Sequence, residues 1–329
     1  MWGLDLQVCP LNALSNPASR LSQATNVFFF DKGFKLPRSV QFRGALEHQI
    51  ATGVMASIDY THIAVSRMDR VRDINLPTQT IDATRRPVYT PSAAVSVNSL
   101  RPDPRFGAVY VIESSARSLY RGMTASINVR RTLFVADAAY TLGFSKSHDD
   151  HENGGFSSAN YVDVNNLENE YGWSNIDQRH QFTTNGVVFL PKGFQLATQM
   201  RFNSGRPFSP RTGVDSNRDG ILNDRPMLNG TVVRRNEEFR KEGYADTSLR
   251  VQKRFTLQSE KTVSVTAELF NVFNVKNMET NQITYGNDLS VPTTNLLFGR
   301  VTDASGNPIV GNTLRTTPFQ VQLGLRFQF

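Results

Sequence analysis

The last ten residues of the chain alternate between apolar and polar side chains. One set of alternate positions holds Val321, Leu323, Leu325, Phe327 and Phe329, and the other holds Gln320, Gln322, Gly324, Arg326 and Gln328. Successive side chains of a β-strand point to opposite faces, so a period of two predicts a strand with one apolar and one polar face. The chain therefore ends in an amphipathic strand whose last residue is aromatic.

The same alternation recurs in four pairs of segments, each pair joined by a short turn. The pairs are 40–50 with 54–61, 123–129 with 136–144, 182–190 with 194–202, and 249–255 with 263–269. Alternating runs joined by tight turns predict β-hairpins. Long segments, among them 145–177, 203–243 and 275–316, separate the hairpins. The pattern predicts nine strands within residues 39–329, with short turns and long loops in strict alternation. Residues 1–38 are either an irregular leader or the remnant of a preceding barrel segment, and 26–30 (NVFFF) form either a short strand or an aromatic cluster.

Charged residues of the predicted strands occupy the polar positions. An arginine in the middle of the lipid-facing surface of a barrel costs roughly 2–4 kcal/mol, so contact with lipid would enforce this segregation. The pattern predicts an all-β fold, an antiparallel up-and-down transmembrane β-barrel whose polar face lines a lumen. The predicted lumen-lining residues are Arg130, Arg201, Arg250, Glu268 and Arg326. Lys253 departs from the pattern, near a turn where its ammonium group can reach the membrane interface.

Composition restricts the class of protein further. The hydrophobic fraction is 39% and no run of eighteen apolar residues occurs, so a transmembrane helix is excluded, whereas barrel strands need only alternate apolar residues. The single cysteine, Cys9, excludes an internal disulfide framework. The net charge of +7 is spread along the chain rather than massed in one patch, which argues against a nucleic-acid partner.

One loop has the spacing of a cation site. Asp215, Asn217 and Asp219 stand at the first, third and fifth positions, and Gly220 follows at the sixth. This spacing lets their oxygens and the Ile221 carbonyl converge on one hard cation, calcium. Pro226 stands where an EF-hand has its glutamate, so Asn223 or Asp224 would complete the ligands. The alternative is a polar turn in which these side chains cap backbone amides and bind no metal.

No other set of residues indicates chemistry. His148, Asp149, Asp150, His151 and Glu152 are adjacent in sequence, but the glycines that follow suggest a solvated acidic run more than a metal site. The order and spacing of serine, histidine, cysteine and aspartate indicate no catalytic triad, and no glycine motif follows a strand and opens a helix. The sequence therefore predicts that the protein is not an enzyme.

Seven stretches of the chain carry a resemblance to a known family: 101–107 (RPDPRFG), 113–126 (ESSARSLYRGMTAS), 140–150 (YTLGFSKSHDD), 177–194 (DQRHQFTTNGVVFLPKGF), 204–226 (SGRPFSPRTGVDSNRDGILNDRP), 267–277 (AELFNVFNVKN) and the closing strand. These stretches resemble the barrel of TonB-dependent outer-membrane receptors, in particular the Oar-like receptors with a carboxypeptidase-regulatory-like domain. They follow one another in the order of the family and cover roughly residues 39–329.

The resemblance implies a location, partners and a transport function. It implies the outer membrane of a Gram-negative bacterium, contact with its lipid, recognition of Phe329 by the barrel-assembly machinery, and uptake of an extracellular substrate energised through TonB. Such barrels have about twenty-two strands around a plug. This sequence shows no signal peptide, plug or TonB box, so we expect the C-terminal portion of a receptor, with TonB contacted only through the missing N-terminal region. About nine or ten strands would form either an open, curled sheet or a smaller closed barrel.

Two other classes of protein remain open at this stage. A calcium-stabilised soluble β-sandwich adhesin would have shorter strands in two packed sheets and would need no detergent. A basic nucleic-acid-binding β-protein would bind DNA in a salt-sensitive manner. The parity of the charged residues favours the barrel over both.

Overall fold

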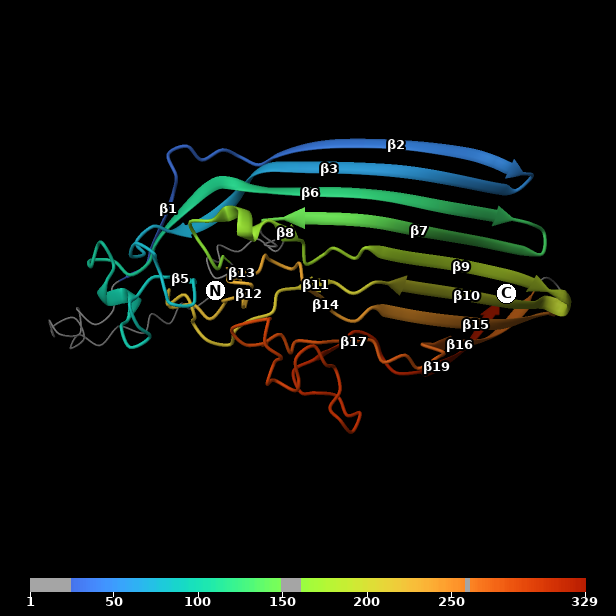
Figure 1. Cartoon of the computed structure of the whole chain (residues 1–329). Helices are drawn as coiled ribbons and strands as arrows, with labels where there is room; N and C mark the ends of the chain where they lie inside the picture. Colours follow the sequence, from blue (N-terminus) through green and yellow to red (C-terminus); the bar gives the residue numbers. More distant parts are fainter. Residues whose placement is uncertain (1–24, 149–160, 258–260) are drawn as a thin grey trace, which may run out of the picture.

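The computed structural model describes residues 25–148, 161–257 and 261–329, and they form one large open sheet (Figure 1). Nine long strands lie side by side in the order β19-β16-β15-β10-β9-β7-β6-β3-β2. Short β1 adds to β6 in parallel, and short β8 adds to β7. The prediction of an all-β, antiparallel, up-and-down arrangement of nine strands is confirmed.

The long strands are β2 (Arg38–Ala51), β3 (Val54–Asp73), β6 (Val109–Arg130), β7 (Phe134–Ser147), β9 (His180–Leu190), β10 (Phe194–Asn203), β15 (Tyr244–Thr256), β16 (Thr262–Phe270) and β19 (Gln320–Gln328). The short strands are β1 (Val27–Phe30), β4 (Thr80–Ile81), β5 (Pro87–Val88), β8 (Gly172–Trp173), β11 (Pro207–Phe208), β12 (Met227–Leu228), β13 (Thr231–Val232), β14 (Phe239–Arg240), β17 (Met278–Glu279) and β18 (Thr313–Leu314). Single-turn helices are η1 (Val97–Ser99), η3 (Leu167–Glu170) and η4 (Pro191–Gly193). None of the described helices is long and apolar enough to cross a membrane.

Short turns and long connections alternate around the sheet, as predicted. The short turns gather at one end of the strands and the long segments extend from the other end (Figure 1). At the first turn Gly53 has φ +70°, and a Cβ there would lie 2.3 Å from the Arg130 carbonyl oxygen, so this close approach of turn and strand requires glycine. Gln328 pairs with Thr262, which puts the carboxyl terminus at the short-turn end.

The sheet does not close on itself within the described residues. β2 and β19 are its two edges, and no ladder joins them. Of the two predicted forms, the structure is therefore the open, curled sheet. The sandwich alternative is wrong, because it requires two packed sheets and this large sheet is single.

Strand register gives the sheet one polar and one apolar face. One row across the polar face reads Met55, Asn128, Asp137, Asn185, Gln199 and Ser248. One row across the opposite face reads Leu46, Ile58, Ala125, Tyr140, Phe182 and Phe202. Cross-strand hydrogen bonds connect the polar side chains, for example Ser57 Oγ with Ser126 Oγ at 2.6 Å. The apolar side chains stay exposed, as a surface facing lipid requires.

Two strands are longer than the pattern predicts. β3 continues to Asp73, well beyond the predicted end at residue 61, and β6 begins at Val109, well before the predicted start at residue 123. The register between β3 and β6 shifts on both sides of Met68, and Arg67 has φ +60°. Such bulges move side chains from one face to the other and interrupt the period of two on which the prediction depended.

The hydrophobic core of the protein lies among the long connections. We call the segments 74–108, 161–179, 204–243 and 271–319 the loop layer. Tyr89, Val97, Tyr161 and Val164 pack together there, with Leu76 and Leu167 against them. The other buried apolar residues of the described chain belong to the loop layer or to the adjoining strand ends. The loop layer is therefore a packed substructure rather than a set of separate loops.

Some predictions concern residues outside the described part of the chain. Residues 1–24, which include Cys9, and the acidic run 149–152 belong to this group. Within the predicted leader, β1 confirms the short strand expected at 26–30. The division of the chain at residue 38 stays a prediction.

Candidate functional site in the loop layer

A buried ion pair holds two segments of the loop layer together. Glu170, at the end of η3, accepts hydrogen bonds from Nη1 and Nη2 of Arg225, each at 2.8 Å. Both side chains are at most 3% exposed. Arg235 Nε donates to the Glu170 carbonyl at 2.9 Å. Because buried charges are tolerated only when they are paired and hydrogen-bonded, this pair fixes segment 161–179 against segment 204–243.

A third segment joins the same framework. Arg86 Nη2 donates to the Arg225 carbonyl at 2.9 Å, and Arg86 Nη1 lies 3.6 Å from Asp224 Oδ1. Arg218 Nη1 donates to the Thr90 carbonyl at 2.7 Å. Segment 74–108 is thereby attached to segment 204–243.

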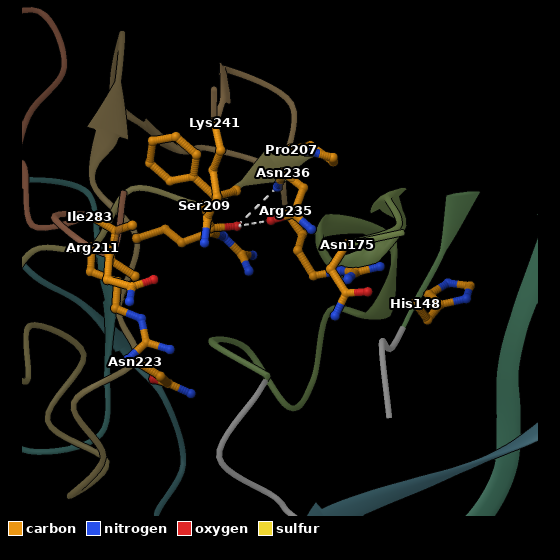
Figure 2. A pocket seen from close by; sticks show the side chains of 13 residues that line it. His148, Asn175, Pro207, Ser209, Arg211, Asn223, Arg235, Asn236, Lys241 and Ile283 are labelled. Carbon is orange, nitrogen blue, oxygen red and sulfur yellow. Dashed lines mark hydrogen bonds between the residues drawn. The ribbon is translucent and has the colours of Figure 1, made fainter. Parts of the chain in front are cut away.

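A cavity of about 350 Å³ lies beside this framework (Figure 2). Its lining is rich in cations and amides and, among the residues that the structure describes, includes no aspartate or glutamate. The cations are Arg211, Arg225, Arg235 and Lys241, and the amides are Asn175, Asn223, Asn236 and Asn281. His148, Pro207, Phe208, Ser209 and Ile283 complete the wall. We call this cavity the loop pocket.

Within the described residues, two carboxylates pair with cations of the loop pocket. Glu170 pairs with Arg225, and Lys241 Nζ lies 2.9 Å from Glu279 Oε1. No ion pair or side-chain hydrogen bond of Arg211 is found within 25–148, 161–257 and 261–329. Burial lowers the pKa of His148, which keeps its ring neutral near pH 7. Guanidinium and amide donors around a cavity whose described lining holds no carboxylate are suited to an anionic, oxygen-rich ligand.

The predicted calcium loop forms a tight turn in the structure. Asp215 accepts hydrogen bonds from the amides of Asp219 and Gly220, at 3.1 and 2.8 Å. Asp219 Oδ1 accepts from the Ile221 amide at 2.8 Å, and Asn217 Oδ1 accepts from the Asp219 amide at 3.0 Å. These are the capping bonds of the metal-free alternative.

The two residues expected to complete the calcium ligands make other hydrogen bonds. Asn223 Nδ2 donates to the Tyr161 carbonyl at 3.1 Å. Asp224 Oδ2 accepts from the amides of Ser216 and Asn217, at 2.6 and 3.0 Å. No group of three or more histidine, cysteine, aspartate or glutamate residues within the described chain is placed to hold a metal.

The same loop nevertheless concentrates negative charge. Burial, together with repulsion by Asp224 and Asp215, raises the pKa of Asp219 to about 7. Burial likewise raises the pKa of Asp224 to about 6. A bound cation would relieve this repulsion, so the chemistry of the side chains fits calcium although their present bonds do not require it. Calcium stays a prediction.

The predicted lumen-lining residues lie on the polar face. Arg250 Nε is 3.5 Å from Glu268 Oε1, on the neighbouring strand. Arg201 stands opposite Asp246, and Arg326 stands opposite Ser264. Arg130 ends β6 on the same face. That this face encloses a lumen stays a prediction.

Sequence reasoning did not single out the loop pocket. Its cations come from positions far apart in sequence, and only the fold brings them together. One indication was available, because the receptor-like stretch 204–226 contains Arg211 and Arg225. His148 lines the pocket, while the rest of its acidic run lies outside the described residues.

Comparison with known proteins identifies the fold. Residues 6–238 match the family described as outer membrane beta barrel domain. The outer membrane transporter YddB from Escherichia coli superposes with a TM-score of 0.52 at 11% identity, over 92% of this chain and 34% of that one. The FrpB iron transporter from Neisseria meningitidis gives a TM-score of 0.46 at 11% identity, over 91% and 32%. This chain thus spans about a third of the length of these transporters. No curated protein sequence matches it.

Proposed function

The chain belongs to the outer membrane beta-barrel domain family and is therefore an outer-membrane protein, and from this premise we propose that it forms part of the barrel wall of a TonB-dependent receptor. The observation that carries the proposal is the open sheet of nine antiparallel strands with short turns at one end and a packed loop layer at the other. The likeness of this sheet to part of the YddB transporter supports it. The seven receptor-like stretches of sequence favour the Oar-like group.

We propose that the loop layer faces the outside of the cell and that the loop pocket captures the substrate. Long loops of bacterial barrels are extracellular, so a pocket built from them meets a solute before it enters the barrel. The charges of the loop pocket favour an anion that carries several oxygen atoms. Transport would draw its energy from TonB, and the protein would make or break no covalent bond of the substrate.

Calcium has a structural role in this proposal. Bound by Asp215, Asn217 and Asp219, it would neutralise the repulsion among the carboxylates of Asp215, Asp219 and Asp224. The segment carrying Arg211 and Arg225 would then be held more rigidly.

Isothermal titration calorimetry of the detergent-solubilised chain tests the pocket. Citrate, a small tricarboxylate, is compared with its uncharged trimethyl ester, and Arg211→Gln is compared with Arg105→Gln. Arg105 is a matched control, because it is an exposed arginine of the loop layer outside the pocket. A charge-assisted hydrogen bond contributes about 1.5–3 kcal/mol, so Arg211→Gln should weaken citrate binding by roughly ten- to hundredfold.

If citrate and its ester bind with equal affinity, or if the two variants lose citrate affinity equally, the assignment of the pocket is contradicted. The transport proposal has its own readout. Accumulation of the captured anion in cells that carry the whole receptor of which this chain is proposed to be a part should fall to background when TonB is deleted.

A further inference from the structure

Two cations stand on the apolar face of the sheet near its long-loop end, where the strand pattern places mostly apolar side chains. Arg121 belongs to the same face of β6 as Leu119 and Met123, because side chains two positions apart share a face. Lys146 belongs to the same face of β7 as Phe144, which stands opposite Arg121. These cations therefore face the lipid rather than the polar side.

Measured along the strands from the short-turn end, the two cations lie at the height of the outward-facing membrane interface. Arg121 is nine residues from Arg130, the short-turn end of β6. At about 3.3 Å per residue and a tilt of about 40°, this places Arg121 roughly 23 Å above the inner boundary of the membrane. Lys146 is eleven residues from Val135, the partner of Arg130, or roughly 28 Å above it. The apolar band of such barrels is about 25 Å tall, so both cations lie where lipid headgroups begin.

A recess of about 440 Å³ surrounds these cations. Its walls are apolar and aromatic, and include Leu119, Met123, Leu142, Phe144 and Trp173. Lys146 Nζ lies 4.3 Å from the centre of the Trp173 ring. Arg179 stacks over the same ring at 4.2 Å and over Phe144 at 4.7 Å. Aromatic faces thus hold two cations at the rim of an apolar recess.

The charges around the recess do not cancel. Lys146 lies 3.7 Å from Glu237, and Arg179 lies 3.5 Å from Asp177, which Arg240 also contacts. Arg121 makes no ion pair with any residue that the structure describes. Arg121, Lys146 and Arg179 thus stand against Glu237 and Asp177 among the described residues, and the rim is positive.

We propose that this recess binds a phosphorylated, multiply acylated lipid of the outer leaflet. The phosphate would contact Arg121 and Lys146, and the acyl chains would lie along Leu119, Met123 and Leu142. Basic groups beside apolar surface at a membrane interface recognise anionic lipid headgroups in this manner. The proposal rests on the outer-membrane location and not on the loop pocket, so either can fail without the other.

Native mass spectrometry and binding titrations of the full chain in detergent micelles test the proposal. The probes are diphosphorylated lipid A and the same lipid after enzymatic removal of both phosphates, with inorganic phosphate as a third ligand. The variant is Arg121→Gln combined with Lys146→Gln. Lys253→Gln is the matched control, because Lys253 is on the same face at the short-turn end, beside the Phe194 ring. Circular dichroism verifies that each variant keeps its β content.

The phosphorylated lipid should bind the double variant roughly thirtyfold more weakly, since each basic residue near a membrane surface contributes about 1 kcal/mol. Lys253→Gln should bind it as the unmodified chain does. The proposal is overturned if the dephosphorylated lipid binds equally well, because the two cations would then be solvated by water and would not contact the lipid phosphates. Equal weakening by Lys253→Gln, or full competition by inorganic phosphate, would also overturn it. If the double variant loses its β content, Arg121→Gln alone is measured in its place.

Discussion

Replacing Glu170 by glutamine removes the counter-charge of a buried arginine and leaves the shape of the side chain unchanged. Two hydrogen bonds of 2.8 Å join the groups, so their charges are about 4 Å apart. At an effective dielectric constant of about 20 the attraction is roughly 4 kcal/mol. Breaking a buried pair by removing one partner typically costs 3–5 kcal/mol. We therefore expect Glu170→Gln to destabilise the loop layer by about 3–5 kcal/mol.

Hydrogen exchange followed by mass spectrometry measures this cost locally. The amide of Val162 donates to Glu170 Oε1, and the amide of Arg235 donates to the Asn169 carbonyl, so peptides containing these residues report on the loop layer. Their exchange should accelerate by at least two orders of magnitude. Peptides from β9 and β10 should be unaffected, because strand pairing does not depend on the ion pair.

Two further variants decide whether the reasoning holds. Glu268→Gln breaks a pair whose side chains are 51% and 31% exposed, and should cost at most about 1 kcal/mol. Combining Glu170→Gln with Arg225→Met removes both charges and should restore part of the protection. A cost for Glu170→Gln no larger than that for Glu268→Gln, or a double variant that is less stable than the single one, would refute the argument.

Three other substitutions or conditions test the fold. Leu323→Arg places a charge on the lipid face and should reduce the stability of the protein in vesicles by roughly 2–4 kcal/mol. Gln322→Arg places the same charge on the polar face and should have little effect. Equal effects of the two substitutions would mean that the faces are misassigned. Gly205→Ala should loosen the loop layer by about 1–3 kcal/mol in exchange experiments, because its Cβ would lie 1.6 Å from the Lys241 carbonyl oxygen, while Gly186→Ala, with no atom within 3.7 Å, should be tolerated. The raised pKa of Asp219, about 7, means that its stabilising contribution is complete below pH 4 and is lost as the pH rises through 7. Without calcium the melting midpoint followed by tryptophan fluorescence should be lower at pH 8 than at pH 5, and millimolar calcium should remove the difference; a midpoint independent of pH would exclude the titration.

The strands could be predicted because each one carries its own evidence. The alternation that ends at Phe329 can be recognised without knowledge of any other segment. Lys253, predicted to lie near a turn, lies at the short-turn end beside the aromatic ring of Phe194. The prediction was incomplete at Arg67 and Met68, where bulges change the face that each side chain occupies. Local patterns give strands reliably as long as the period of two persists.

The loop pocket could not be predicted because its parts become neighbours only in three dimensions. Glu170 and Arg225 are 55 residues apart, and Arg86 is 139 residues from the carbonyl that it contacts. No period or spacing in a polar loop distinguishes an arginine that is buried against a distant glutamate from one that is solvated. Asp215 and Asp219 show the opposite case, because their spacing predicted a local turn but not whether a cation occupies it.

The separation between Glu170 and Arg225 also has a consequence for the order of folding. Successive long strands pair with their neighbours in the chain, so the sheet can grow by contacts of short range, which form quickly. The ion pair spans the β9–β10 hairpin and can form only after both strands have been placed and the loops on either side have met. Assembly should therefore show two kinetic phases, a fast one for the strands and a slower one in which the loop layer closes. Glu170→Gln should slow or abolish only the second.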